Sequence, residues 1–182
     1  LSGPAAAQTT GFALDRFDPS ERGSDWFAAD SLDLRGRGRP AVGVVGSWSY
    51  KPLVAYGPDG SERTVLVRHQ VVTHLGASVV LWERLRLGLN LPVVIASKGD
   101  DAVVNGTQYV APDGGGVGDL RLSADVRLFG VYGDPFTVAL GASLFAPTGS
   151  RELFAGDEKI RLQPHPPAAG ALGPPAHSAK PG

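Results

Sequence analysis

The chain has 182 residues and a net charge of −1 at pH 7, so its length suits one domain and its charge provides no basic field for a nucleic-acid partner. It contains no cysteine, which excludes disulfides, thiolate catalysis and cysteine-based zinc sites. No run of about 18 apolar residues occurs, so the sequence predicts no transmembrane helix.

The first residues carry signs of export. Ala5 and Ala7 form an A-x-A arrangement that resembles the cleavage end of a secretory signal. We therefore expect residues 1–8 to be a signal-peptide remnant and residues 9–39 to form a periplasmic segment that leads into the first strand. The basic cluster within this segment is expected to be hydrated rather than bound to anionic headgroups, and it consists of Arg35, Arg37 and Arg39.

Six stretches alternate apolar and other residues with period two, as strands with two different faces do. The clearest places Leu87 and Leu89 on one face and Arg86 and Asn90 on the other. No stretch shows convincing helical periodicity, so the sequence predicts an all-β fold, an antiparallel up-and-down meander of about six long strands. These predicted strands cover residues 40–51, 65–81, 84–93, 119–128, 136–144 and 159–163.

Strand length and the rhythm of the connections favour a membrane barrel over a soluble sandwich. Most stretches run about 10 residues, whereas soluble strands usually have about 5 or 6. Long and short connections alternate, as external loops and periplasmic turns do. We therefore expect residues 40–163 to form an incomplete transmembrane β-barrel with two open edges, placed in the lipid of a Gram-negative outer membrane. The long connections are 52–64, about 96–117 and 148–158, and the short ones are 82–83 and 130–135.

Aromatic residues fall at the ends of the predicted strands. Trp48 and Tyr50 lie at the outer end of the first strand, and Trp82, Tyr132 and Phe136 lie at the inner turns. Amphipathic rings collect at these two levels of a bilayer, so we predict that these five residues lie at the membrane interfaces.

The polar face of the strands predicts the barrel interior. An arginine near the middle of a bilayer costs about 2–4 kcal/mol, so the arginine sides cannot contact hydrocarbon. The interior is then either a pore that favours anions or a space filled by cross-strand ion pairs. We favour the filled interior, because small barrels are often just wide enough for side chains, and glycines at 43, 76, 88 and 141 leave room for them. The predicted pore-lining residues are Arg68, His74, Arg84, Arg86, Asn90, Asp119, Arg121, Asp125 and Arg127.

No residue pattern predicts catalysis, a cofactor or a metal site. His69 and His74 point to opposite faces of one strand and cannot ligate a metal together. His74 shares a face with Ser78, but neither a nucleophile elbow nor a third orienting residue accompanies them, so a barrel hydrolase is the weakest alternative. The loop aspartates lack the rhythm of a calcium loop, and no helix follows the glycine run 114–118 to hold a phosphate.

Several short motifs add a family resemblance. They are FALDRFDPS at 12–20, DWF at 25–27, YKPLV at 50–54, LWERLRLGLNLP at 81–92, GDLRL at 118–122 and PTGS at 147–150. Together they resemble the N-terminal β-barrel region of OmpA-family outer-membrane proteins of the myxobacterial type, over about residues 12–163. This resemblance implies a structural, envelope-anchoring role with some passage of small solutes, and contact with peptidoglycan through a domain absent from this sequence.

Two alternatives for the function stay open. Similar strand-and-turn patterns occur in outer-membrane channels of aromatic-compound degradation, which would make the chain a dedicated channel for small or apolar substrates. A secreted soluble β-sandwich that acts as a binding module is the other. Residues 164–182 contain six prolines and no alternation, so we expect a disordered tail where a further strand of the truncated barrel would stand.

Overall fold

The computed structural model describes residues 12–24, 27–28, 31, 33–104, 107–131, 134 and 136–165. The predicted signal remnant and most of the predicted tail lie outside these residues.

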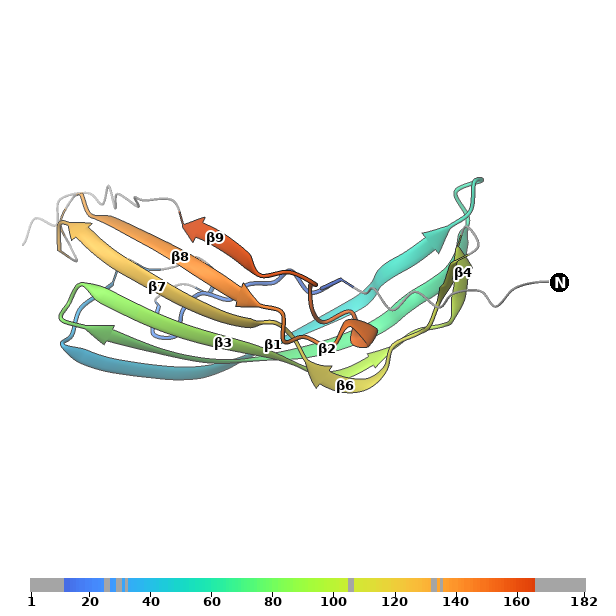
Figure 1. Ribbon diagram of the computed structural model, residues 1–182, viewed down its shortest axis with the longest axis horizontal. Helices are drawn as coiled ribbons and strands as arrows, with labels where there is room; N and C mark the ends of the chain where they lie inside the picture. Colours follow the sequence, from blue (N-terminus) through green and yellow to red (C-terminus); the bar gives the residue numbers. More distant parts are fainter. Residues whose placement is uncertain are drawn as a thin grey trace, which may run out of the picture.

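A single antiparallel sheet dominates the described chain (Figure 1). Its main path runs β1-β2-β3-β7-β8-β9, and β6 pairs with the far end of β3. A separate two-stranded pair, β4 with β5, and one 3-10 turn, η1, lie in the connections. The bounds are β1 Gly38–Tyr56, β2 Glu62–Leu81, β3 Leu85–Lys98, β4 Ala102–Val104, β5 Thr107–Tyr109, β6 Asp113–Val117, β7 Leu120–Phe129, β8 Val138–Ala146, η1 Arg151–Leu153 and β9 Arg161–His165.

The predicted fold class is confirmed. Neighbouring strands of the main path are consecutive along the chain and antiparallel, apart from the short strands inserted between β3 and β7. The sheet curves but does not close within the described residues, which leaves β1 and β9 as its outermost strands. Within the described part of the chain, no helix is long and apolar enough to cross a membrane.

The first hairpin is longer than predicted. The prediction of a loop over 52–64 was wrong, because β1 ends at Tyr56 and β2 begins at Glu62. Lys51 adopts a left-handed conformation with φ of 49°, and the pairing register shifts between Tyr50 and Leu53. This irregularity absorbs the proline at position 52 as a β-bulge, so β1 continues to Tyr56 instead of stopping. We call the part of the hairpin beyond the bulge, residues 51–68, the hairpin extension.

Two other boundaries also differ from the prediction. The expected long loop at 96–117 holds β4, β5 and β6, which its glycines and short runs did not reveal. At the far edge, β9 runs past Pro164, which lies opposite Ala142 of β8. Proline is tolerated there because an edge strand needs hydrogen bonds on one side only.

The pairing register sorts side chains into two faces. Leu75 lies opposite Leu91, and Gly76 lies opposite Asn90. Because side chains alternate along a strand, the first pair marks one face of the sheet and the second pair marks the other. We call the face of Leu75 the outer face and the face of Asn90 the inner face.

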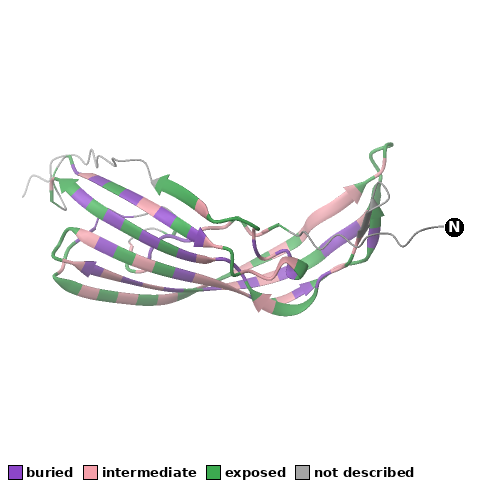
Figure 2. Ribbon diagram, in the orientation of Figure 1, coloured by how far each residue is buried: buried purple, intermediate pink, exposed green. Residues whose placement is uncertain are grey.

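The outer, apolar face is the exposed one. Leu89 and Leu122 are both 41% exposed, while Arg86 and Arg121 on the inner face are only 3% exposed. Figure 2 shows this as alternating exposed and buried residues along β3, β7 and β8. A water-soluble sheet buries its apolar face, so this sheet is inverted relative to that arrangement.

A small apolar core forms near the hairpin extension. Val65 and Val67, at the start of the predicted strand 65–81, are buried there. The connection after β3 covers them, since Asp100 donates its backbone N–H to the carbonyl of Val65 at 3.0 Å.

Candidate functional site

An extended N-terminal segment covers the inner face of the sheet. We call residues 12–35 the strap, and its described part crosses the inside of the curved sheet in blue in Figure 1. The strap contains no helix or strand among its described residues, and it is held by side-chain hydrogen bonds. The described part of the predicted entry segment 9–39 therefore packs against the sheet.

Arg22 reaches across three strands. Its Nε donates to the carbonyl of Gly43 at 3.2 Å, and its Nη2 donates to the carbonyl of His74 at 3.1 Å and to Oδ1 of Asn90 at 3.3 Å. In return, Ser78 donates its hydroxyl to the carbonyl of Arg22. This single side chain thus bridges β1, β2 and β3 from the inside.

Glu21 anchors the strap to β7. Its carboxylate accepts from Nη2 of Arg121 at 2.8 Å and from the hydroxyl of Ser123 at 2.6 Å. The side chains of Glu21 and Arg121 are 1% and 3% exposed, so this ion pair is fully buried. Arg121 also pairs with Asp18 and donates to the carbonyl of Pro19. Buried charges persist only when they are paired, and the strap supplies the partners that the inner face requires.

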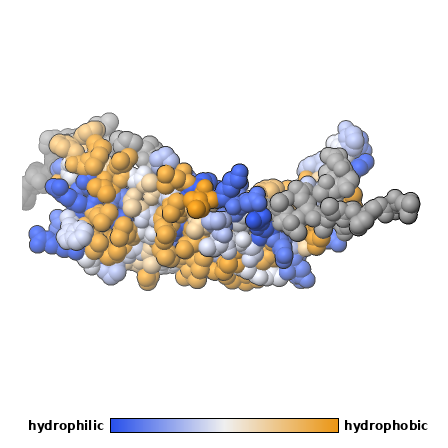
Figure 3. All heavy atoms as spheres, viewed as in Figure 1, coloured by the Kyte–Doolittle hydropathy of each residue, from blue (hydrophilic) through white to orange (hydrophobic). Residues whose placement is uncertain are grey.

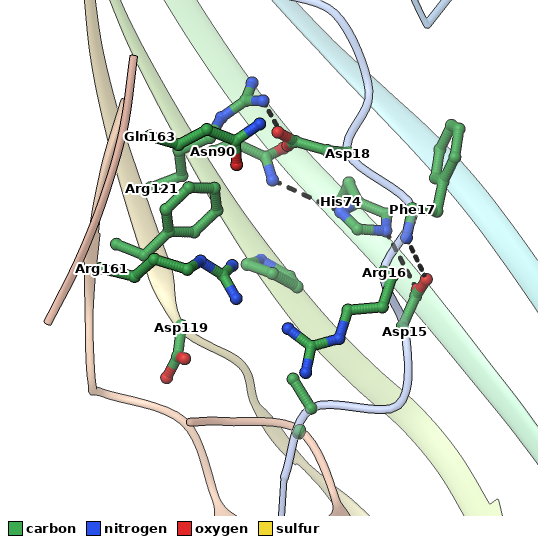
Figure 4. A pocket seen from close by; sticks show the side chains of 14 residues that line it. Asp15, Arg16, Phe17, Asp18, His74, Asn90, Asp119, Arg121, Arg161 and Gln163 are labelled. Carbon is green, nitrogen blue, oxygen red and sulfur yellow. Dashed lines mark hydrogen bonds and ion pairs between the residues drawn. The ribbon is translucent and has the colours of Figure 1, made fainter. Parts of the chain in front are cut away.

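Asp15 and His74 form a second contact between strap and sheet (Figure 4). Arg22 fixes the amide oxygen of Asn90, so the amide nitrogen donates to Nδ1 of His74 at 3.3 Å. Nε2 of His74 therefore carries the proton and donates to Asp15 at 3.3 Å. Burial raises the pKa of Asp15, but hydrogen bonds from His74, the Phe17 N–H and Ser47 outweigh it and keep that pKa below its usual value.

The end of the strap is held by charged groups as well. Asp33 accepts from Nε of Arg35 at 2.7 Å and from Nη1 of Arg39 at 2.9 Å. These hydrogen bonds, that of Arg35 first, hold the pKa of Asp33 well below its usual range despite its burial. All three arginines of the predicted hydrated cluster are ion-paired: Arg35 and Arg39 pair with Asp33, and Arg37 lies 3.9 Å from Glu83. Arg35 and Arg37 are nevertheless exposed.

Glycines on the inner face make room for the strap. A side chain at Gly76 would approach the guanidinium carbon of Arg22 to 2.7 Å, and one at Gly88 would collide with the carboxylate of Glu21. Gly43 likewise lies against Arg22. Of the four glycines predicted to leave room for long side chains, three do so for the strap, and Gly141 instead accommodates Asp125.

Gly76→Ala is expected to lower the free energy of unfolding by about 1–3 kcal/mol, because the added methyl group must displace Arg22. Gly46→Ala is the matched control, since its methyl group would meet nothing within 4 Å, and we expect a change within about 0.5 kcal/mol. Urea unfolding of the two variants side by side measures this difference. Equal effects would show that the strap does not fill this part of the inner face.

Acid is expected to weaken the strap. A carboxylate with a lowered pKa in the folded state stabilises it above the pKa of the unfolded chain, near 3.9 for aspartate, and loses that contribution as the pH falls through the folded value. For Asp15 and Asp33 the loss therefore begins below about pH 4. The urea midpoint should fall from pH 7 to pH 3, and the Asp15→Asn, Asp33→Asn double variant should show a smaller fall. An unchanged pH dependence in that variant would contradict the assignment.

Most of the predicted pore-lining residues share the buried inner surface. Seven of the nine are buried: His74, Arg86, Asn90, Asp119, Arg121, Asp125 and Arg127. Arg86 pairs with Asp125 at 3.0 Å and donates to the carbonyl of Ser31 in the strap. The cross-strand ion pair that the filled interior requires is therefore present.

Arg68 and Arg84 differ from these seven residues, because both are exposed. Arg68 lies in the hairpin extension and pairs with exposed Asp100 at 2.5 Å. Arg84 lies in the turn between β2 and β3, outside both strands. The structure also separates His74 from Ser78, because Asp15 and Asn90 occupy the two ring nitrogens while Ser78 donates to Arg22.

The predicted interface aromatics are exposed where they are described. Trp48, Tyr50, Trp82 and Phe136 are 54–69% exposed, and Tyr132 lies outside the described residues. Trp48 and Tyr50 lie at the middle of the longer β1 rather than at its end, and both rings contact His69, with centroids 6.1 and 5.1 Å away.

A cavity of about 290 Å³ remains between the strap and the inner face (Figure 4). Its walls come from the strap, from β2, β3, β7, β8 and β9, and from the loops that flank them. The lining residues are Ala13, Asp15, Arg16, Phe17, Asp18, His74, Asn90, Pro92, Asp119, Arg121, Phe145, Ala155, Arg161 and Gln163.

The outer face carries no charge between the aromatic levels. Five paired strands present only apolar residues, glycine, proline or threonine at their outward positions, and Figure 3 shows apolar side chains gathered over this part of the sheet. Threonine occurs once, at position 73. The outward positions lie within 40–48, 71–79, 85–93, 120–128 and 138–146.

No family model, no curated protein and no solved structure matches this chain.

The strap was not predicted from the sequence. Its side chains are placed by tertiary contacts, and no periodicity marks an irregular segment. One signal was present in the sequence: Asp15, Asp18 and Glu21 lie close together, and their charges complement the arginines expected on the inner face. Charge matching between a non-strand segment and a predicted lumen could have suggested the contact.

Proposed function

We propose that this chain is part of an outer-membrane β-barrel whose outer face contacts lipid and whose interior is filled by its own strap. The observation that carries the proposal is the inverted burial of the sheet, with leucine and valine exposed and arginine and aspartate buried. Lipid accepts such an apolar face without cost, whereas water does not. The OmpA-family resemblance points to the same class of protein.

The spacing of the aromatic residues supports this placement. Trp48 lies opposite Val71 on β2, ten residues from Leu81, which precedes Trp82 at the turn. Ten residues at about 3.3 Å each span about 33 Å along the strand. At a strand tilt of about 40°, this corresponds to about 25 Å of height, which is the usual height of the apolar band in outer-membrane barrels.

The filled interior favours a structural role in the envelope over a wide channel. Glu21, Arg22 and Arg121 occupy the inner face with ion pairs and hydrogen bonds that an open pore would leave to water. We therefore propose anchoring or stabilisation of the envelope, with slow passage of small solutes at most. Peptidoglycan contact through a further domain stays a prediction of the resemblance.

Two alternatives have less support. A dedicated channel needs a passage where the strap lies. A soluble β-sandwich needs a second sheet against the outer face, and in the described part of the chain none covers Leu89 or Leu122.

Vesicle flotation tests the proposal. The chain is refolded from urea with phosphatidylcholine vesicles and centrifuged through a density gradient in high salt, which removes surface-bound protein. We expect the folded chain to float with the lipid. A chain that stays folded and monomeric at the bottom of the gradient, without lipid or detergent, would contradict a membrane role.

A further inference from the structure

The cavity inside the sheet has balanced charge. Three guanidinium groups and three carboxylates line it. Two of the guanidinium groups, those of Arg16 and Arg161, also donate to Asp157, which is not part of the lining. A bound cation or anion would therefore find its charge opposed as well as attracted. This balance favours a neutral ligand. The charged lining residues are Arg16, Arg121, Arg161, Asp15, Asp18 and Asp119.

Two hydrogen-bond donors of this lining have no partner among the residues that the structure describes. The Nε atoms of Arg121 and Arg161 are buried and make no hydrogen bond within the described chain. The side chain of Arg121 is 3% exposed, so bulk water does not reach it. Buried donors are normally paired, and each of these two can take one acceptor.

The same wall offers acceptors and apolar surface. Asp119 accepts from the backbone N–H groups of Gly149 and Asp157, and a carboxylate has about four acceptor sites, so it can receive further donors. Phe17 and Phe145 add aromatic rings, and the guanidinium of Arg161 lies 4.2 Å from the centre of the Phe145 ring. A ligand that fits needs donors, acceptors and apolar edges together.

We propose that the cavity binds a neutral polyhydroxylated molecule of about the size of a monosaccharide. Hydroxyl groups both donate and accept, so they can satisfy the Nε–H groups of Arg121 and Arg161 and the spare acceptor sites of Asp119. The ring carbons of the same molecule pack against Phe145. The volume of about 290 Å³ holds the equivalent of about ten waters and lies just below the range of drug-sized pockets. This site rests on the proposed function in one respect: if the sheet is part of a barrel, the sugar is a solute held in the barrel interior.

Calorimetry with glucose tests the inference. The full chain, refolded in a sugar-free zwitterionic detergent, should bind glucose saturably with a dissociation constant on the order of 1 mM. Arg161→Lys keeps the positive charge beside Asp157 but removes the Nε–H donor, and we expect binding to weaken about fivefold. Arg151→Lys is the matched control, because Arg151 is also 39% exposed and ion-paired but does not line the cavity, and its binding should be unchanged.

Several outcomes would overturn the inference. These are no saturable heat with glucose or N-acetylglucosamine, tighter binding of benzoate than of either sugar, and equal weakening by the two arginine variants. Preference for N-acetylglucosamine over glucose would support the inference and indicate a sugar unit of an envelope glycan rather than a free hexose. Vesicle flotation is independent of this readout: a chain that binds glucose but does not float would refute the membrane role and leave the sugar site standing.

Discussion

Leu89→Arg is expected to prevent stable insertion of the folded chain into lipid vesicles. Leu89 lies on the outer face at the middle of the sheet, between Ala77 of β2 and Leu122 of β7. An arginine near the midplane of a bilayer costs about 2–4 kcal/mol, which corresponds to a shift of roughly 30-fold to 1,000-fold in the folding equilibrium. Urea titration of the vesicle-bound chain measures this loss.

Two controls separate lipid contact from general damage to the sheet. Leu89→Ala keeps the position apolar and should cost less than Leu89→Arg in the same titration. Asp59→Arg changes an exposed residue in the turn between β1 and β2, and we expect almost no effect. An arginine at position 89 that leaves stability and insertion unchanged would show that this face does not contact hydrocarbon.

Glu21→Leu is expected to lower the free energy of unfolding by about 3–5 kcal/mol. The substitution leaves Arg121 and the hydroxyl of Ser123 buried without their shared acceptor. Removing Glu21 is costly because Arg121, in a poorly solvated site, keeps only the partly exposed Asp18 as its ion-pair partner. Denaturant unfolding in vesicles checks the size of the effect.

The control for this prediction is a double-mutant cycle. Arg121→Met in the Glu21→Leu background removes the charge that lost its buried partner, so the double variant should be more stable than the sum of the two single changes predicts. Strict additivity would contradict a direct interaction between the strap and β7. If the strap fills the lumen, Glu21→Leu should also raise ion conductance across a planar bilayer.

The sheet could be predicted because its strands repeat one simple pattern. Leucine alternates with arginine in β3 and β7, and this pattern predicted both strands. In β8, alanine and leucine alternate with glycine and serine, which predicted that strand as well. The pairings of β2 with β3 and of β7 with β8 then follow from the short turns between these strands, whereas long connections join β3 to β7 and β8 to β9. Boundaries failed where local geometry overrides the pattern, as at Lys51, where a bulge lets β1 continue through Pro52.

The interior could be predicted only in part. Face assignment correctly grouped Arg86, Asn90 and Arg121, since their parity along the strands fixes the side to which they point. Parity does not show what covers that side, so it could not place Arg22 against His74 or Glu21 against Arg121. It also could not separate Arg68 from the others, because exposure there depends on the hairpin extension and not on alternation.

The central claim is that the outer face contacts lipid while the strap covers the inner face. The natural chain has no cysteine, so single cysteines can carry spin labels without other changes. Labels at Leu89 and Leu122 in vesicles should be accessible to oxygen and protected from a water-soluble nickel complex, and a label at Asp59 should show the reverse. If the labels at the two leucines were accessible to the nickel complex, the outer face would not contact lipid. If they were protected from both oxygen and the nickel complex, the outer face would be packed against a second sheet, which would also contradict the central claim.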